Sequence, residues 1–292
     1  MAQPVEKFVQ VGDYNTRYIE AGEGEPVLLL HPACPGAHAA LDYRYTIGPL
    51  SEHFRVLAPD LIGFGGTDSP TRLLKHPTYV EHMVGFMKAV SATPAHLIGN
   101  CRGGLVAISV AGEYPDLVRR LILIGNAGGG IPPELEEKAL KPYAEFVPTR
   151  ENVKSFLSRC FFDADRHVAE DSFEAQFGAS VRQYDAYARL GGYPMDVPNL
   201  KPLLAEMTVP TLFICGREDK VLTLEQAMRG YAMTPGARMY VIADCGLHPQ
   251  LEHPEEFNRV ALQFLQGKLT GEGNDVTVGS IVGAREALAQ PA

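Results

Sequence analysis

Short, continuous apolar runs alternate with helix-length segments along this chain, and this alternation limits the folds that the chain can adopt. The runs are Val27–Leu30, Arg55–Ala58, Ala95–Gly99, Arg120–Ile124, Thr211–Cys215 and Met239–Ile242. The helical patterns between several of them are Thr78–Val90, Gly104–Tyr114 and Leu224–Tyr231. Runs without polar alternation are typical of strands buried on both faces of a parallel sheet. We therefore predict an α/β fold with a doubly wound, mostly parallel sheet and helices on both faces.

A hairpin pattern precedes the alternation of apolar runs and helical segments, and a long helical segment interrupts it. Phe8–Val11 and Thr16–Glu20 flank a polar turn, which predicts an antiparallel hairpin. From residue 131 to residue 204, helical signals, prolines and aromatics replace the strand signal and predict an inserted helical cap. The predicted core therefore covers residues 1–130 and 205–266 and ends with the helix Pro254–Leu265. Residues 267–292 are expected to form a mobile tail or a peripheral helix.

Composition excludes several classes of protein. The chain has 292 residues, of which 46% are hydrophobic, so it is long enough to bury a large core. A net charge of −9 without a dense Lys/Arg run argues against binding to nucleic acid or to an anionic membrane. No apolar run reaches membrane-spanning length, and the first residues lack a signal-peptide pattern. We expect a cytoplasmic protein with no membrane or nucleic-acid partner.

The cysteine pattern argues against a structural framework of disulfides or zinc. The five cysteines are Cys34, Cys101, Cys160, Cys215 and Cys245. Their number is odd, and they show neither CxxC spacing nor regular spacing, which is typical of a reducing compartment. We therefore expect no structural zinc site and no other metal site.

Cys101 carries the strongest chemical signal. It stands between the apolar run Ala95–Gly99 and the helical pattern that begins at Gly104. This layout matches the G-x-S-x-G nucleophile elbow, with cysteine in place of serine. Gly99 and Gly103 suit such a turn, because strand and helix approach each other closely there. The alternative is a buried structural cysteine, so the partners of Cys101 decide between the two interpretations.

Two candidate partners follow later apolar runs. Asp219 comes after Thr211–Cys215, and His248 comes after Met239–Ile242. The carboxyl ends of parallel strands meet at one edge of a sheet, and active sites lie at that edge. The order nucleophile, acid, histidine therefore predicts a triad of Cys101, Asp219 and His248. In it, the histidine takes the thiol proton and the aspartate orients the imidazole.

Several motifs resemble those of the α/β-hydrolase family, and in particular those of its meta-cleavage-product hydrolases, which cleave carbon–carbon bonds. The motifs are His31–Ala37 (similar to H-G-x-G-P-G-A), Asp60–Asp68 (similar to the loop after the fourth strand), Gly99–Gly104 (similar to G-N-S-M-G-G) and Glu252–Asn258 (similar to the start of the last helix). The resemblance extends from Phe8 to Leu265. It implies the α/β-hydrolase fold, and its G-x-x-D pattern favours Asp219 over Glu218 and Asp244 as the acid.

The resemblance also implies roles for residues around the triad. The backbone N–H groups of Ala33 and Arg102 would form the oxyanion hole. The Arg102 side chain departs from the family, which has methionine there, and its positive charge is expected to lower the thiol pKa, to receive an anionic group or to form a salt bridge. Candidate substrate-binding residues are Asn100, Cys34, His38, Gln176 and Leu247. His31 is expected to brace its loop, and His253 to lie solvated at the start of a helix.

Three departures from the family pattern bear on the substrate. Cys101 replaces a serine, and a thiolate suits activated esters, lactones and thioesters. Pro249 stands where tryptophan usually follows the histidine, and the chain contains no Trp. Gln176 aligns with the arginine that holds the substrate carboxylate, and a neutral amide cannot make a charged bidentate clamp. The arginines that would replace it are Arg102, Arg182 and Arg189.

The sequence thus predicts a cofactor-independent hydrolase that acts on a carbonyl carbon of a small, aromatic-derived substrate. The bond cut is the C–C bond of a ring-fission product or, alternatively, the C–O bond of an ester or lactone, through a thioester intermediate. Two further classes stay open. One is a lyase or cofactor-free oxygenase that uses the His–Asp pair as a base, and the other is a non-catalytic binding module. A homodimer is also open, because dimers are common among the relatives.

Overall fold

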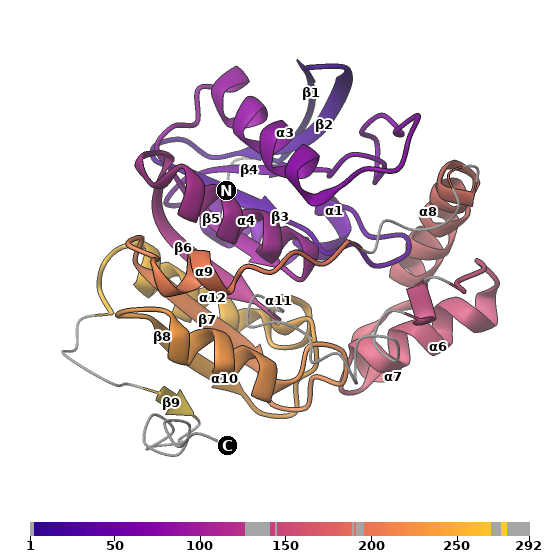
Figure 1. Ribbon diagram of the computed structural model, residues 1–292. Helices are drawn as coiled ribbons and strands as arrows, with labels where there is room; N and C mark the ends of the chain where they lie inside the picture. Colours follow the sequence, from indigo (N-terminus) through magenta and orange to yellow (C-terminus); the bar gives the residue numbers. More distant parts are fainter. Residues whose placement is uncertain are drawn as a thin grey trace.

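The predicted apolar runs join in one sheet, which crosses the centre of Figure 1. The computed structural model describes residues 3–125, 141–143, 145–188, 190, 196–269 and 276–278. The strands are β1 (Val5–Val11), β2 (Tyr14–Ala21), β3 (Pro26–Leu30), β4 (Arg55–Pro59), β5 (Ala95–Asn100), β6 (Val118–Ile124), β7 (Thr211–Gly216), β8 (Arg238–Ile242) and β9 (Val276–Val278). Their order in space is β1-β2-β4-β3-β5-β6-β7-β8-β9.

The sheet is parallel from β4 to β9, as the continuous apolar runs predicted. Each of the six runs lies within one strand, and β5 and β7 are buried along their whole lengths. From β3 the chain goes outward to β4 and then returns to the other side of β3 to form β5. The carboxyl ends of β3 and β5 therefore form a topological switch point, where ligands bind in sheets of this kind.

The predicted N-terminal hairpin is confirmed. β1 and β2 pair antiparallel with Val11 opposite Tyr14, so that the connection is Gly12–Asp13. Gly12 has a φ of +56°, which a tight hairpin turn requires and which glycine adopts without strain. β2 then pairs antiparallel with β4. The hairpin thus extends the parallel sheet at the edge remote from β9.

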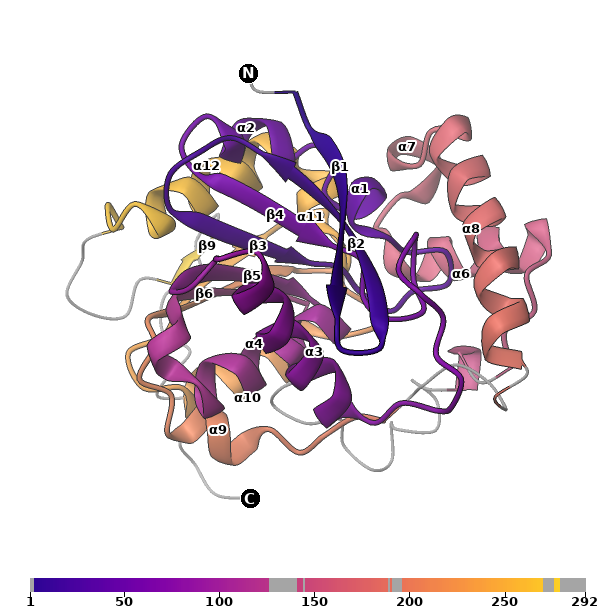
Figure 2. The same cartoon turned by 90° about the horizontal axis from the view of Figure 1, so that it is seen from above.

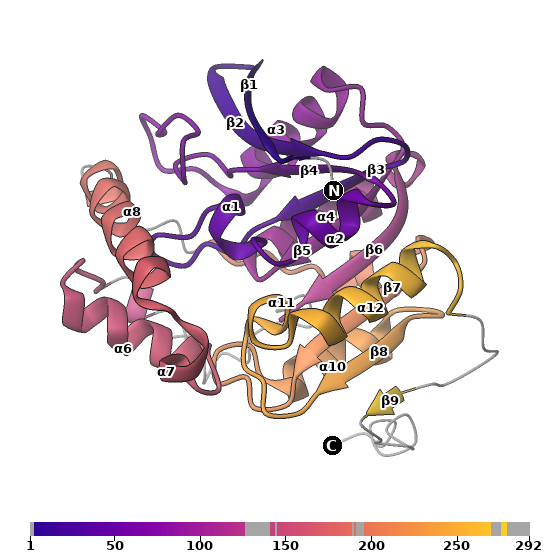
Figure 3. The ribbon, with the colours of Figure 1, turned by 180° about the vertical axis from the view of Figure 1, so that it is seen from behind.

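Helices cover both faces of the sheet. The helices within the described residues are α1 (Ala39–Asp42), α2 (Ile47–Ser51), α3 (His76–Ala89), α4 (Arg102–Glu113), α6 (Arg150–Cys160), α7 (Ala164–His167), α8 (Glu170–Ala188), α9 (Lys201–Ala205), α10 (Leu224–Met233), α11 (Pro249–Glu252) and α12 (Pro254–Leu265), with a 3₁₀ turn at Pro115–Leu117. Figure 1 shows α3, α4, α9 and α10 on one face, and Figure 3 shows α2 and α12 on the other.

Each layer of helices packs against its own apolar cluster on one face of the sheet. Along β5, Leu97 belongs to the cluster under α3 and α4, and Ile98 to the cluster under α2 and α12. The doubly wound architecture predicted from the alternation is therefore confirmed. Within the described residues, every helix is too short or too polar to cross a membrane.

The segment between β6 and β7 carries the helices α6, α7 and α8, which stand to one side of both layers (Figure 2). An ion pair between Arg150 and Glu174 joins α6 to α8, and the Arg150 guanidinium lies 5.2 Å from the ring centre of Phe173. The predicted cap boundary at residue 131 lies outside the described residues. The boundary at residue 204 falls within α9, which packs against α4 and α10. The division into core and cap stays a prediction.

Part of residues 267–292, which were expected to form a tail or a peripheral helix, forms a strand instead. Val276–Val278 pair parallel with β8 and form β9. Without β9, β8 would be the edge of the sheet, and an edge strand offers unpaired backbone N–H and C=O groups to any extended segment. The remaining residues of the predicted tail beyond 269 lie outside the described residues.

Candidate active site

Cys101 occupies a strained turn between β5 and α4. It has a φ of +50° and a ψ of −112°, and it is the N-cap of α4. A positive φ is uncommon for a residue with a side chain and marks backbone strain. The N–H of Cys101 donates to the carbonyl of Ile124 at 3.1 Å, and its carbonyl accepts from Leu105. This is the geometry predicted for a nucleophile elbow.

The two glycines of the elbow are required by close contact between backbones. A Cβ on Gly99 would lie 2.5 Å from the carbonyl oxygen of Gly103. A Cβ on Gly103 would lie 2.1 Å from the carbonyl oxygen of Leu30, at the end of β3. These atoms belong to the backbone of a buried sheet and cannot rotate away. The first turn of α4 therefore rests directly on β3.

Gly103→Ala should destabilise the protein by about 3 kcal/mol, because overpacking against fixed backbone is costly. Gly112→Ala, in the same helix, is the matched control, since the added Cβ would lie 3.1 Å from side-chain atoms of Leu203, a contact that a shift of a few tenths of an ångström relieves. Alanine also favours helix by about 1 kcal/mol over glycine, so the control should change stability by less than about 1 kcal/mol. Urea unfolding measures both. Equal losses in the two variants would contradict the close contact at the elbow.

The Cys101 thiol is protonated at neutral pH. Burial of the sulfur, and to a smaller extent the neighbouring Cys34, raise its pKa to about 12, whereas Arg102 acts in the opposite direction. The expected activation by Arg102 is thus outweighed by burial. The guanidinium of Arg102 donates to the carbonyl of Asp196 and lies 5.9 Å from the ring centre of Tyr79. Cys101 therefore needs a base to become a thiolate.

His248 provides a neutral base at the same edge of the sheet. It follows β8, is 3% exposed, and stacks on Phe161 with ring centres 4.9 Å apart. Burial, and to a smaller extent the charge of Arg44, lower its pKa to about 3. Its Nδ1 lies 3.3 Å from the side-chain nitrogen of Asn100 and 3.5 Å from that of Gln250. The imidazole is therefore neutral at pH 7 and able to accept a proton.

Asp219 is buried in the loop after β7, at the same edge of the sheet. Its Oδ1 accepts from the backbone N–H groups of Val221 and Leu222, whereas its Oδ2 has no hydrogen-bond partner among the described residues. Oδ2 and the Oδ1 of Asn100 both lie close to Gly125, at 3.3 and 3.5 Å from the place of a Cβ there. Burial raises the pKa of the Asp219 carboxyl to about 7.

Side-chain amides lie next to His248 Nδ1, where the predicted triad has the carboxylate of Asp219. The hydrogen-bond neighbours of His248 Nδ1 are Asn100 and Gln250, and no Asp219–His248 hydrogen bond occurs between these described side chains. Within the described part of the chain, three buried oxygens at this edge of the sheet have no hydrogen-bond partner: Asp219 Oδ2, Asn100 Oδ1 and Gln250 Oε1. Such acceptors favour a positive charge on the imidazole. Catalytic hydrogen bonds are often long or misaligned without substrate and tighten when it binds.

The rival acids have other partners. Glu218 accepts from the N–H of Cys245 and pairs with Arg217. The Asp244 side chain is 67% exposed and lies 3.6 Å from Arg217. His253 is the N-cap of α12, as expected, and one of its ring nitrogens lies 3.0 Å from the Asp244 carbonyl oxygen. Asp219 is therefore the most buried of the three candidate acids.

The loop after β3 is held by the core on one side and by α8 on the other. His31 braces it as expected, with Nδ1 2.7 Å from the carbonyl oxygen of Pro32 and Nε2 2.9 Å from the N–H of Leu61. From α8, Gln183 accepts from the N–H of Gly36 and donates to the carbonyl of Ala37. A Cβ on Gly36 would lie 2.2 Å from the backbone of α8. This loop carries Ala33, so its N–H is positioned from both sides.

The predicted substrate-binding residues differ in what they contact. Gln176 donates its amide N–H to the carbonyl of Pro35, so it joins α8 to the loop after β3. Leu247 is fully buried, and its carbonyl lies 3.3 Å from Asn100 Nδ2. His38 has a buried Nδ1 with no partner among the described residues, and burial lowers its pKa. Cys34 is buried beside Cys160. Substrate contacts of these residues stay predictions.

Sequence reasoning missed the residues that fix the histidine loop. The carboxylate of Glu252 accepts from the backbone N–H groups of Gly246, His248 and Phe162. It thereby ties the loop to the end of α6, where Cys160 also accepts from the N–H of Leu247 at 2.7 Å. A glutamate in the first turn of a helix gives no signal of such a role, because these contacts join segments far apart in the chain.

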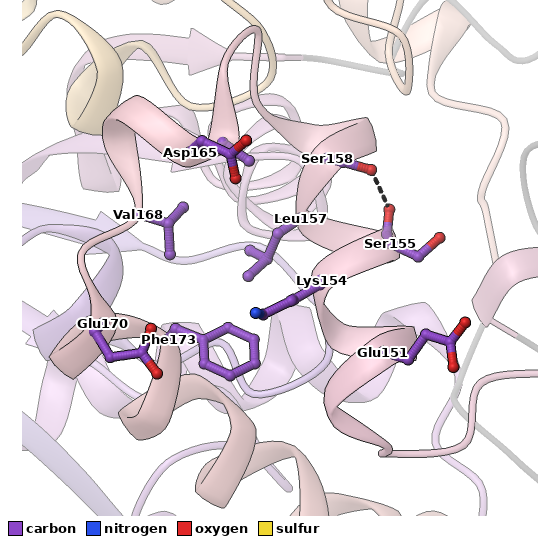
Figure 4. A pocket seen from close by; sticks show the side chains of 10 residues that line it. Glu151, Lys154, Ser155, Leu157, Ser158, Asp165, Val168, Glu170 and Phe173 are labelled. Atoms are coloured by element: carbon purple, nitrogen blue, oxygen red, sulfur yellow. Dashed lines mark hydrogen bonds between the residues drawn. The ribbon is translucent and has the colours of Figure 1, made fainter.

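A separate pocket of about 530 Å³ lies among α6, α7 and α8 (Figure 4). Lys154, Leu157, Val168 and Phe173 point into it, and the carboxylates of Asp165 and Glu170 lie at its rim. None of the predicted site residues lines this pocket. It belongs to the surface of the helical segment.

Comparisons with known sequences show which proteins this chain is similar to. A sequence model described as the alpha/beta hydrolase family matches residues 27–260. A 2-hydroxy-6-oxo-6-(2'-aminophenyl)hexa-2,4-dienoic acid hydrolase of Metapseudomonas resinovorans is 32% identical over 270 residues, which cover 89% of this chain and 91% of that protein. A 2-hydroxymuconate semialdehyde hydrolase of Pseudomonas putida is 31% identical over 265 residues, with 86% and 91% covered.

Solved structures share the fold over nearly the whole described chain. A meta-cleavage product hydrolase of Pseudomonas fluorescens IP01 superposes with a TM-score of 0.80 at 29% identity, and the match covers 89% of this chain and 97% of that one. A serine hydrolase involved in carbazole degradation superposes with a TM-score of 0.78 at 29% identity, with 90% and 99% covered. The latter is named for a serine, whereas this chain has Cys101 at its elbow.

Proposed function

We propose a substrate class and a mechanism for this chain, which belongs to the alpha/beta hydrolase family. It is a hydrolase whose similar proteins are named as hydrolases of ring-fission products. The proposed reaction is cofactor-independent hydrolysis of the C–C bond beside a carbonyl carbon in a small, aromatic-derived acid. The observation that supports the proposal is the placement of Cys101, on a strained elbow after β5, of buried Asp219 after β7 and of neutral His248 after β8, all at the carboxyl edge of one sheet.

In the proposed first half-reaction, the Cys101 proton moves to His248 while the sulfur attacks the carbonyl carbon. The backbone N–H groups of Ala33 and Arg102 stabilise the oxyanion. The C–C bond then breaks, and the leaving carbon takes the proton from the imidazolium, which leaves a thioester on Cys101. Asp219, through its unpartnered Oδ2, is the group that we assign to stabilise the imidazolium.

The second half-reaction releases the acid. His248 takes a proton from water, and the resulting hydroxide attacks the thioester carbon. The C–S bond breaks, and the sulfur regains its proton from His248. A thiolate is a good leaving group, so this step is compatible with cysteine. No step requires a metal ion or an organic cofactor.

Ester or lactone hydrolysis is the second candidate, and the contacts of Gln176 favour it. The residue that aligns with the carboxylate-binding arginine is neutral, and it already donates to Pro35. Of the alternative arginines, Arg102 donates to Asp196, Arg189 lies outside the described residues, and Arg182 contributes positive charge near His38. A substrate without a carboxylate would need none of them.

The test is turnover of a matched substrate panel combined with intact-mass spectrometry. The panel contains a 2-hydroxy-6-oxo-dienoate, an activated aryl ester and an unsaturated lactone. We expect turnover of the dienoate with a transient acyl adduct on Cys101, trapped by acid quenching within milliseconds. Processing of the ester or lactone alone would replace the first candidate by the second. Turnover without an adduct in the quenched samples would instead support base catalysis by His248 and Asp219.

A further inference from the structure

The fold gathers three soft metal ligands that are far apart in the sequence. The sulfurs of Cys34 and Cys160 and a ring nitrogen of His248 all lie within 4.8 Å of one another. The three residues are 2%, 1% and 3% exposed. Cys34 comes from the loop after β3, Cys160 from the last turn of α6 and His248 from the loop after β8. Their separation in the chain explains why cysteine spacing predicted no metal site.

We propose that Cys34, Cys160 and His248 form a binding site for a soft divalent cation, Zn²⁺ or Cd²⁺, and that the bound ion inhibits the hydrolase by occupying its base. Thiolate sulfur and imidazole nitrogen are the ligands that such cations prefer. Inhibition rests on the role of His248 proposed above, whereas binding does not.

The distances suit a tetrahedral ion. With Zn–S bonds of about 2.3 Å and Zn–N bonds of about 2.0 Å, ligand atoms lie about 3.5–3.8 Å apart. Because all three atoms lie within 4.8 Å of one another, no pair needs to approach by more than about 1.3 Å. The fourth position of the ion would take a water.

All three ligands stand on braced segments. Gln183 holds the loop of Cys34 through two hydrogen bonds. Glu252 and the hydrogen bond from Leu247 to the Cys160 carbonyl hold the other two ligands against each other. Little conformational entropy would then be lost on binding, which favours a preorganised site.

The charges balance when the ion binds. Each cysteine loses its thiol proton to solvent, and the neutral imidazole contributes a lone pair. Two thiolates and one dication give a complex with no net charge. A buried pair of thiolates without the cation would be strongly disfavoured, so the ion and the deprotonated sulfurs stabilise each other.

The experiment titrates the whole protein with Cd²⁺ and records the ultraviolet charge-transfer absorbance of cadmium thiolates. We expect one ion per chain in the wild type and in Cys101→Ala, because the nucleophile is not a ligand. Cys160→Ala should weaken binding by about 100-fold or more. Cys215→Ala, another buried cysteine in β7, is the matched control and should bind as the wild type does. Cys34→Ala replaces Cys160→Ala if thermal unfolding shows that the latter does not fold.

Activity is measured in parallel with Zn²⁺ and then with EDTA. We expect turnover to fall in proportion to occupancy and to return when the chelator removes the ion, while Cys160→Ala resists inhibition. Wild-type binding by Cys160→Ala, or loss of binding in Cys101→Ala or Cys215→Ala, would overturn the site. Full turnover with the ion bound would overturn the proposal that the ion inhibits by binding to His248. The absorbance is read whether or not a substrate is turned over, so it separates this proposal from the proposed function.

Discussion

Cys101→Ala should lower kcat by about 10⁴–10⁶-fold, because loss of a nucleophile removes the covalent pathway and leaves only binding and the oxyanion hole. The thiol has no second group to replace it at the elbow, since neighbouring Cys34 and Cys160 are almost fully buried. The fold should be retained, because the substitution removes one sulfur at a partly exposed position. KM should change by much less than kcat.

The measurement is steady-state turnover of whichever panel compound the wild type processes, together with thermal unfolding. Cys215→Ala is the control, because it removes a buried sulfur from the sheet without touching the elbow. If Cys101→Ala keeps more than about a tenth of wild-type kcat, Cys101 is not the nucleophile. The His248–Asp219 pair would then have to act as a base directly on the substrate.

Asp219→Asn should lower kcat by about 10³–10⁴-fold and yet stabilise the protein at alkaline pH. The loss of activity follows from the loss of a negative charge beside the imidazolium that forms during catalysis. The gain in stability follows from burial, because Asp219 Oδ2 has no partner and the carboxyl has a pKa of about 7 in the folded protein. The ordinary value of an aspartate is 3.8.

The direction of the pH effect follows from proton binding. Between pH 4 and pH 7 the folded protein keeps this proton while the unfolded chain has lost it, so rising pH favours the unfolded state. Above pH 7 the cost of the buried carboxylate is fully present and amounts to about 4 kcal/mol. The asparagine variant has no such cost, and its oxygen still accepts from Val221 and Leu222.

Urea unfolding at pH 4.5, 6 and 8 measures this effect. The free energy of unfolding of Asp219→Asn relative to wild type should increase across this range and level off above pH 7. Glu218→Gln is the control, because Glu218 is the adjacent acid and is paired with Arg217 at the surface. A pH-independent difference between Asp219→Asn and wild type would mean that Asp219 has an ordinary pKa.

The local elements were readable from the sequence because each depends on a short stretch of chain. Six apolar runs became six strands, and the helix predicted at Pro254–Leu265 has those bounds in the structure. The elbow was readable because Gly99 and Gly103 are adjacent to Cys101 and their role is steric. The strand β9 was not predicted, because it consists of only three residues after a Gly-rich stretch. These residues form a strand by pairing with the open edge of β8.

Contacts around the site were less predictable. The prediction of Gln176 as a substrate-binding residue came from alignment, and its hydrogen bond to Pro35 depends on how α8 lies over the loop after β3. The charge of Arg102 was expected to act on Cys101, but burial of the thiol has the larger effect on its pKa. Both outcomes depend on which groups exclude water from a side chain, and a linear sequence does not contain that information.

The sequence by itself determined the doubly wound sheet, the elbow and the order of nucleophile, acid and histidine, because periodicity and small residues act over a few positions. Only the tertiary structure decided the ionisation of the site and the neighbours of His248. Asn100 and Gln250 lie beside its Nδ1, and Cys34 and Cys160 lie close to its ring. Such groups meet because strands distant in the chain end at one edge of the sheet, and burial there sets the protonation of each.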